Sequence, residues 1–231
     1  MTSYCGTPPL PQEWLLRWNF DPVLLLALAI GTALALRAPR PGFALAGVAA
    51  LAVAFVSPLC ALSVALFAAR AAHHILLVAV AAPLFALAFP ARRATALVPS
   101  FLAATATLWA WHLPALYDRA LTDTAIYWLM QLSLLATATL SWRALFAAAP
   151  IPAALTAIAA MAQMGMLGAL LTFAPRALYA AHATTTQVWG LAPLADQQLA
   201  GLIMWVPGIL PYALATALIA RRLWTRTAAT A

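Results

Sequence analysis

The stretch GFALAGVAALAVAFVSPLCALSVALFAA, residues 42–69, carries no charged side chain over a length greater than one bilayer crossing requires. Hydrocarbon offers no water to the backbone, so such a stretch must pair its N–H and C=O groups internally. It is rich in Ala and Leu and lacks the alternating pattern of a membrane β-barrel strand. The stretch therefore predicts two membrane helices, with the break expected at Ser57-Pro58 because proline disfavours a helical residue before it.

The rest of the chain has the same character. Of its 231 residues, 66% are hydrophobic and 7% are charged, and the mean hydropathy is +0.95, which lies outside the range of soluble domains. The apolar runs are Pro22 to Leu36, Gly42 to Ser57, Leu59 to Phe89, Ala94 to Trp111, Thr124 to Trp142, Pro152 to Phe173 and Gln197 to Ala220. We predict an all-α polytopic membrane helix bundle of about seven transmembrane helices, with residues 1–231 forming a single integral membrane domain.

The arginines predict the orientation of this bundle. Seven spans place the termini on opposite sides, and the positive-inside rule then compares the two sets of loops. One side collects eight arginines: Arg37, Arg40, Arg92, Arg93, Arg143, Arg221, Arg222 and Arg226. The other side holds Arg17, Arg119 and Arg176, while Arg70 falls near or in the membrane. We therefore expect the N-terminus outside and the C-terminus in the cytoplasm, in an inner membrane.

Composition also excludes several classes of protein. The basic residues are arginines scattered between apolar runs, without a single Lys, so no nucleic-acid partner is expected. Cys5 and Cys60 lie far apart without a CxxC motif, and we expect two free thiols. No basic region precedes the first apolar run, so it is expected to be a retained helix and the mature chain to be the whole chain.

The four histidines are the strongest candidates for chemistry. His73 and His74 lie early in the third predicted helix, His112 at the end of the fourth and His182 in the last outer loop, so all belong to the outer half. Arg70 precedes the first two by one helical turn and disfavours their protonation, and metal binding needs neutral imidazole. The structural alternative is that one ring bonds a neighbouring helix and the other faces lipid headgroups.

Acidic and amide side chains could support a site around His112. This residue lies in Trp109-Ala110-Trp111-His112-Leu113-Pro114, which is either an interfacial belt or a ligand oriented by a carboxylate such as Asp118 or Asp196. Asp196 opens the seventh predicted helix, where an N-cap is its ordinary role. Gln197 follows and could hold a ligand, a water molecule or a partner helix.

Two methionines of the sixth predicted helix offer softer ligands. Met161 and Met164 share a helix face, and thioethers favour Cu(I). Methionine is also a common gap filler between packed helices, and Gly165 and Gly168 on the same helix indicate close packing.

These motifs together resemble the CtaG-type (Caa3_CtaG) cytochrome c oxidase assembly factors, polytopic membrane proteins of bacteria. The resemblance spans Trp14 to Trp224, and its most specific pieces are DQQLAGLIMWVPG, residues 196–208, and WAWHLPALYD, residues 109–118. It implies a factor for maturation of haem-copper oxidase, a metallochaperone for copper delivery or insertion, with no reaction of its own. The implied partners are oxidase subunits and a periplasmic copper chaperone.

The resemblance also assigns residues. His74 is similar to the family's histidine at the start of the third helix, His112 to that of its Trp-His-x-Pro motif, and Asp196 and Gln197 to its helix-seven pair. Many members carry a His-x-x-x-His pair in the third helix, where this chain has Arg70 in place of the first histidine. A second pair, in the fifth helix, is replaced by Tyr127 and Gln131. Copper would then have fewer ligands, or would recruit His73, His182 and methionines.

Other functions remain open from the residues alone. A scaffold that grips oxidase subunits through small-residue and Trp-rich faces needs no metal, and it accounts for the missing histidines. A haem carrier or a transporter would need paired histidines or a midplane polar residue, and neither is clear. No Ser/His or paired-Asp arrangement indicates a hydrolase.

Overall fold

The computed structural model describes residues 3–91 and 96–228, and every regular element among them is a helix. The α-helices are α1 (Pro22–Ala35), α2 (Pro41–Phe55), α3 (Leu59–Ala65), α4 (Phe67–Ile75), α5 (Ala82–Ala88), α6 (Leu97–Trp111), α7 (Pro114–Thr122), α8 (Thr124–Ala147), α9 (Pro150–Thr172), α10 (Pro193–Trp205) and α11 (Leu210–Ala228). The short elements are η1 (Trp14–Leu16), the π-helical η2 (Leu76–Ala81), η3 (Ala180–His182), η4 (Gln187–Trp189) and η5 (Pro207–Ile209). The all-α prediction is confirmed.

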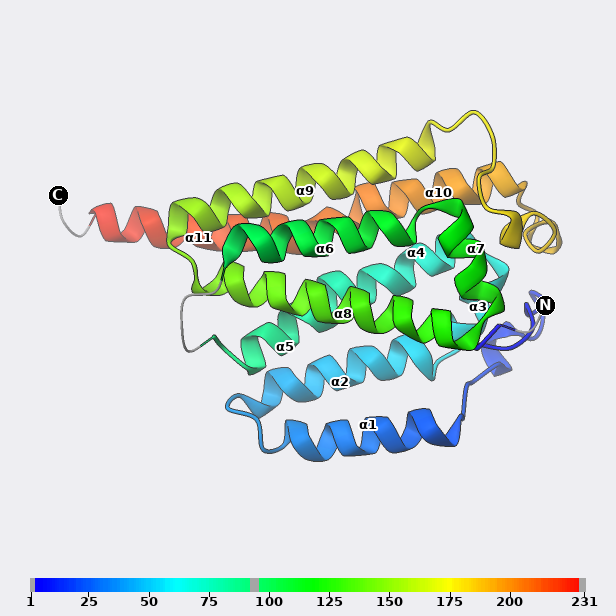
Figure 1. Ribbon diagram of the computed structural model, residues 1–231, viewed down its shortest axis with the longest axis horizontal. Helices are drawn as coiled ribbons and strands as arrows, with labels where there is room; N and C mark the ends of the chain where they lie inside the picture. The colour runs from blue at the N-terminus through cyan, green and yellow to red at the C-terminus, as the bar shows by residue number, and fades with distance from the viewer. Residues whose placement is uncertain (1–2, 92–95, 229–231) are drawn as a thin grey trace.

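The long helices run side by side along the longest axis of the molecule, and the two termini lie at opposite ends (Figure 1). One end, which we call the histidine end, carries the N-terminus, α3, α7 and the connection from α9 to α10. The other, the C-terminal end, carries the α1–α2 and α8–α9 turns and α11. Arg92 and Arg93, and the start of the fourth predicted run at Ala94, lie outside the described residues.

Several of these helices can cross a membrane. Within the described ranges, Phe67–Ala88, Pro150–Thr172 and Pro193–Arg221 are long and apolar enough to do so, and the bent pair α2 and α3 makes a fourth if it counts as one span. α1 and α6 are apolar but shorter. Along α1, Val23, Leu26, Ile30 and Leu34 are each more than half exposed, as expected of a face that meets lipid.

Two breaks shape the first half of the bundle. The predicted break at Ser57-Pro58 is confirmed, since α2 ends at Phe55, α3 begins at Leu59, and the two axes differ by 44°. The prediction of a continuous helix from Leu59 to Phe89 is wrong. The chain is extended at Leu66, with φ −125° and ψ 131°, because side chains from elsewhere in the fold pair the backbone groups exposed there.

The prediction of two free thiols is also wrong. Cys5 and Cys60 form a disulfide that joins the segment before α1 to the start of α3, with their Cα atoms 5.4 Å apart. Local sequence could not indicate this pairing, because 55 positions separate the two residues. Tyr4 then stacks on Tyr127 of α8 at 5.1 Å between ring centroids, so the N-terminal segment covers the histidine end.

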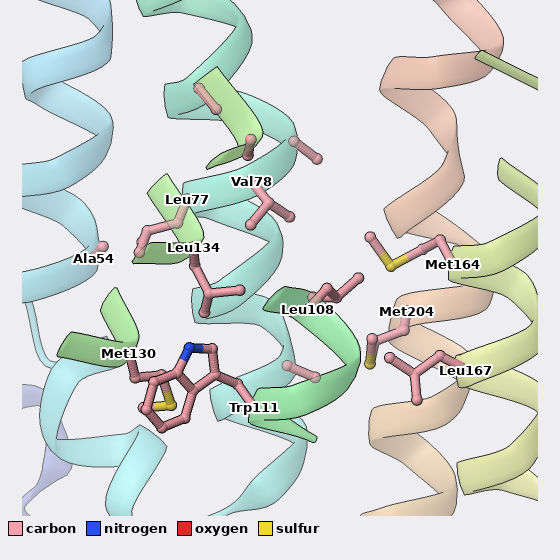
Figure 2. Close-up of a cluster of buried hydrophobic side chains, with 14 of the residues drawn as sticks. Ala54, Leu77, Val78, Leu108, Trp111, Met130, Leu134, Met164, Leu167 and Met204 are labelled. Carbon is pink, nitrogen blue, oxygen red and sulfur yellow. The ribbon is translucent and has the colours of Figure 1, made fainter. Parts of the chain in front are cut away.

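The core is built from small and apolar side chains. α9 and α10 approach so closely that a Cβ on Gly168 would lie 2.7 Å from the Gly201 carbonyl oxygen, which explains glycine at both positions. Met164, Leu167 and Met204 belong to one apolar cluster with Leu108 (Figure 2). Met164 is therefore packed among apolar side chains, as the gap-filling alternative expects.

Candidate functional site

The break at Leu66 prepares the site, because it leaves backbone groups on both sides that a continuous helix would have paired. The Ala65 carbonyl accepts a hydrogen bond from the Thr185 hydroxyl at 2.6 Å. The Phe67 and Ala68 N–H groups donate to the carboxylate of Asp196 at 2.6 and 3.1 Å. The break is thus stabilised by residues more than 100 positions away.

Asp196 has a different capping role from the one expected. The N-cap of α10 is Ala192, and Asp196 lies one turn inside that helix. Its buried carboxylate instead caps α4, where negative charge is favoured by the helix dipole. The prediction that Asp196 caps its own helix is therefore wrong, because tertiary packing brings α4's free N–H groups within its reach.

The four histidines are brought to the same end of the molecule and are all buried. His73 and His74 point from α4, with ring centroids 6.0 Å apart. His112, just after α6, lies 5.7 Å from His74. His182 of η3 is 5.8 Å from the ring of Phe67, which is itself 6.5 Å from His112. We call these four residues the histidine cluster.

Most ring nitrogens of this cluster have no hydrogen-bond partner. His112 Nδ1 bonds the Leu108 carbonyl at 2.7 Å, which leaves its Nε2 unpaired. Both nitrogens of His73 and both of His74 are enclosed and unpaired. Such buried groups usually find a partner, so a concentration of exceptions points to a ligand or ordered water.

Arg70 lies in the same buried region. Its side chain is fully buried, its three guanidinium nitrogens have no hydrogen-bond partner, and its Cζ lies 5.3 Å from the Tyr127 ring centroid. No carboxylate among the described residues forms an ion pair with it. A positive charge here disfavours protonation of the imidazoles and also opposes a bound cation.

The loop that carries His182 is held by two side chains of α7. Asp118 accepts from the N–H groups of Ala180 and Ala181, both at 3.1 Å. The Tyr117 hydroxyl shares a 2.7 Å hydrogen bond with His182 Nε2. Burial, aided by the Arg70 charge, lowers the pKa of His182 to about 3, and burial raises the pKa of Tyr117 above its ordinary range. Both groups are neutral at pH 7.

The remaining predicted residues are placed apart from the imidazoles. The Gln197 amide donates to the Leu171 carbonyl at 3.2 Å, and its oxygen accepts from Leu178 N–H at 2.7 Å, so it joins α10 to the end of α9. Asp118 and Asp196 bond backbone groups and make no bond to His112. Met161 is half-buried on α9.

The two positions that the resemblance matches to a second histidine pair also face inward. Tyr127 and Gln131 are one turn apart on α8 and both are buried. Neither amide atom of Gln131 has a partner. A polar region therefore persists where this chain lacks those histidines.

These residues allow at most a sparse metal site. Across residues 3–91 and 96–228, no group of three or more His, Cys, Asp or Glu side chains has the arrangement to hold a metal ion. The ring centroids of His74 and His112 lie 5.7 Å apart in an edge-to-face contact, and each ring has at least one nitrogen without a hydrogen-bond partner.

Sequence reasoning missed three residues of this end. Thr185 and Tyr117 have been described above, and the third is Tyr179, whose hydroxyl donates to the His112 carbonyl at 2.8 Å. Tyr117 lies inside the stretch WAWHLPALYD around His112 and could have been singled out. No local pattern marks Thr185, because its partner is a carbonyl freed by a helix break.

Fold and site together define a helical membrane protein with a buried, histidine-rich polar cluster at one end. The family model of the cytochrome c oxidase caa3 assembly factors (Caa3_CtaG) matches residues 91–226, and the chain belongs to this family. That confirms the resemblance, and the family's role is assembly of cytochrome c oxidase. No curated protein and no solved structure matches the chain.

Proposed function

We propose that this protein acts in cytochrome c oxidase assembly as a metallochaperone that holds one copper ion transiently between His74 and His112. The membership of the family supports oxidase subunits as partners. The copper is cargo, received from a periplasmic copper chaperone and passed to the oxidase, and the chain performs no reaction of its own.

One observation carries this proposal. Two buried imidazoles, one from α4 and one from the end of α6, have ring centroids 5.7 Å apart, and both have unpaired nitrogens that could serve one ion as two ligands. Imidazole is a common copper ligand. A site with two protein ligands holds its ion weakly enough to release it, which suits a transient carrier. His73 and His182 lie beside the pair and offer further nitrogens during transfer.

The orientation is part of the proposal. We infer about seven spans in a bacterial inner membrane, with the histidine end in the periplasm and the C-terminus in the cytoplasm. The Cys5–Cys60 disulfide lies at the histidine end, and disulfides persist in oxidising compartments such as the periplasm. The excess of arginines at the C-terminal end supports the same orientation.

The test is copper stoichiometry on detergent-purified protein without a histidine tag, after copper loading and a chelator wash. We expect wild type to retain about one copper per chain, and His74→Ala and His112→Ala to lower the affinity by about 10- to 100-fold. Trp111→Phe is the matched control, because it removes a hydrogen bond to Ser133 at the position next to His112 without removing an imidazole. Unchanged copper retention in the His74 and His112 variants would refute the proposal.

Enlarging Gly168 or Gly201 would not distinguish a non-metal scaffold from a copper carrier. Both glycines pack inside the chain, where any Cβ would meet backbone atoms. Larger residues there would disrupt the fold under either hypothesis. A scaffold is instead supported if oxidase assembly in cells survives His74→Ala and His112→Ala together while the variant protein accumulates normally.

A further inference from the structure

A cavity at the C-terminal end is unrelated to the histidine cluster. It has a volume of about 540 Å³ and lies between η2, α5, α8 and α11, beside the α1–α2 turn (Figure 1). That volume is within the range of about 300–1,000 Å³ that small-molecule sites occupy. Its walls come from apolar side chains such as Val80, Leu84, Phe146 and Leu214.

Two arginines are the charged members of this lining. Among the eighteen described residues that line the cavity, Arg40 and Arg143 carry charge and none is acidic. Arg143 is half-buried and its Nε is enclosed without a partner. Arg40 makes one long hydrogen bond, 3.4 Å, to the Leu87 carbonyl. Neither forms an ion pair within the described part of the chain.

The chain's own carboxylates cannot neutralise these charges. The chain has five Asp and Glu side chains, and all of them belong to the histidine end: Glu13 and Asp21 before α1, Asp118 in α7, Asp123 before α8, and Asp196 near the start of α10. The positive charge at the C-terminal end therefore calls for an external anion. Guanidinium groups pair well with phosphate because their N–H donors match two of its oxygens.

We propose that this cavity binds an anionic phospholipid, with its phosphate at Arg40 and Arg143 and acyl chain in the apolar groove. An amphiphile fits this lining best, because among its described residues Arg40 and Arg143 carry the charge and the other sixteen are apolar. Basic pockets between membrane helices bind anionic lipids in this way. The inference does not depend on the copper proposal.

The test is native mass spectrometry of the full-length protein in detergent, titrated with dioleoylphosphatidylglycerol or dioleoylphosphatidylcholine. We expect wild type to prefer the anionic lipid by at least 10-fold. The double variant Arg40→Gln/Arg143→Gln should lose that preference. The matched control Arg119→Gln/Arg176→Gln removes the same charge at the histidine end and should keep it.

A second variant tests the groove separately from the charges. Leu84→Trp fills the cavity and should lower the affinity for phosphatidylglycerol at least 5-fold. In wild type, glycerol phosphate, which has no acyl chain, should fail to compete with phosphatidylglycerol. Equal binding of the two lipids, equal binding by the double variant, or full competition by glycerol phosphate would each overturn the proposal. Thermal unfolding of each variant verifies that the fold is retained.

Discussion

At the scale of single residues, Arg70 bears most directly on the proposed copper site. It lies one turn before His74 and places a buried positive charge beside the imidazoles, and no carboxylate of the described residues forms an ion pair with it. A cation bound by His74 and His112 must overcome that charge.

Replacing Arg70 should therefore strengthen copper binding. Arg70→His removes the repulsion and introduces the His-x-x-x-His pair with His74, so we expect at least a 10-fold rise in copper affinity, measured by competition with a chelator. Arg70→Gln, which removes only the charge, should give a smaller rise. Lower affinity in both variants would mean that the guanidinium holds the site together.

His182 should make stability depend on pH. Its pKa of about 3 in the folded protein lies below the ordinary 6.5, so the unfolded chain binds more protons between these values. Above about pH 6.5 His182 is neutral in both states and the free energy of unfolding is at its highest with respect to this group. As the pH falls towards 3, the free energy of unfolding falls by up to about 1.4 kcal/mol per pH unit.

His182→Gln should reduce this dependence by close to one proton. The measurement is the free energy of unfolding in detergent at pH 4, 5, 6 and 7, for wild type and variant. Tyr117→Phe is the matched control, because it removes the 2.7 Å hydrogen bond and leaves the imidazole in place. Parallel pH profiles for wild type and His182→Gln would contradict the expectation.

At the scale of elements, the long helix that the third apolar run predicts is broken at Leu66 and takes a π-helical turn at η2, and side chains from elsewhere in the chain pair the freed backbone groups. Asp196 and Thr185 serve the break at Leu66. At η2, the Ala82 N–H donates to the Leu77 carbonyl, five residues back. In the same pattern the Val78 carbonyl would accept from residue 83, but Pro83 has no N–H to donate. The Trp142 indole donates to that carbonyl at 2.9 Å instead.

Removing the Asp196 cap should destabilise the protein. Asp196→Ala leaves two buried N–H groups unpaired, and we expect a loss of about 1.5–3 kcal/mol in the free energy of unfolding. Asp123→Ala is the matched control, since Asp123 also accepts two backbone N–H bonds, both at Oδ1, at the exposed start of α8. That control should cost less, because water replaces its bonds. Equal losses would show that burial adds nothing.

Trp142→Phe tests the hydrogen bond that pairs the Val78 carbonyl of η2. The change retains an aromatic ring against Tyr212, now stacked at 4.6 Å, but leaves the Val78 carbonyl unpaired. We expect about 1–3 kcal/mol of destabilisation. Trp109→Phe, which loses a bond to the half-buried Gln163, is the control and should cost less. Thermal unfolding in detergent measures both.

At the scale of the whole molecule, the bundle separates its chemistry by end. Histidines, carboxylates and the disulfide gather at the histidine end, while the lipid-sized cavity and its arginines lie at the other. A membrane-spanning chain gains from this separation, because each end meets a different compartment. Under the proposed orientation, the disulfide lies in the end that meets the oxidising compartment.

Cys5→Ser/Cys60→Ser should lower the free energy of unfolding by roughly 2–5 kcal/mol, since the bond closes a long loop in the unfolded chain. Intact wild type should not react with maleimide under denaturing conditions until it is reduced, which mass spectrometry detects. Reaction of both thiols without reductant would contradict the disulfide and weaken the periplasmic assignment.

The sequence by itself determined the all-helical class, the family, the break at Ser57-Pro58 and the concentration of histidines in one half. These properties follow from hydropathy, proline geometry and motif, which are local. Only the tertiary structure decided the disulfide, the break at Leu66, the capping partner of Asp196 and the proximity of His74 to His112. Each of these depends on groups far apart in the chain, and only packing brings such groups within the few ångströms over which hydrogen bonds and ring contacts form.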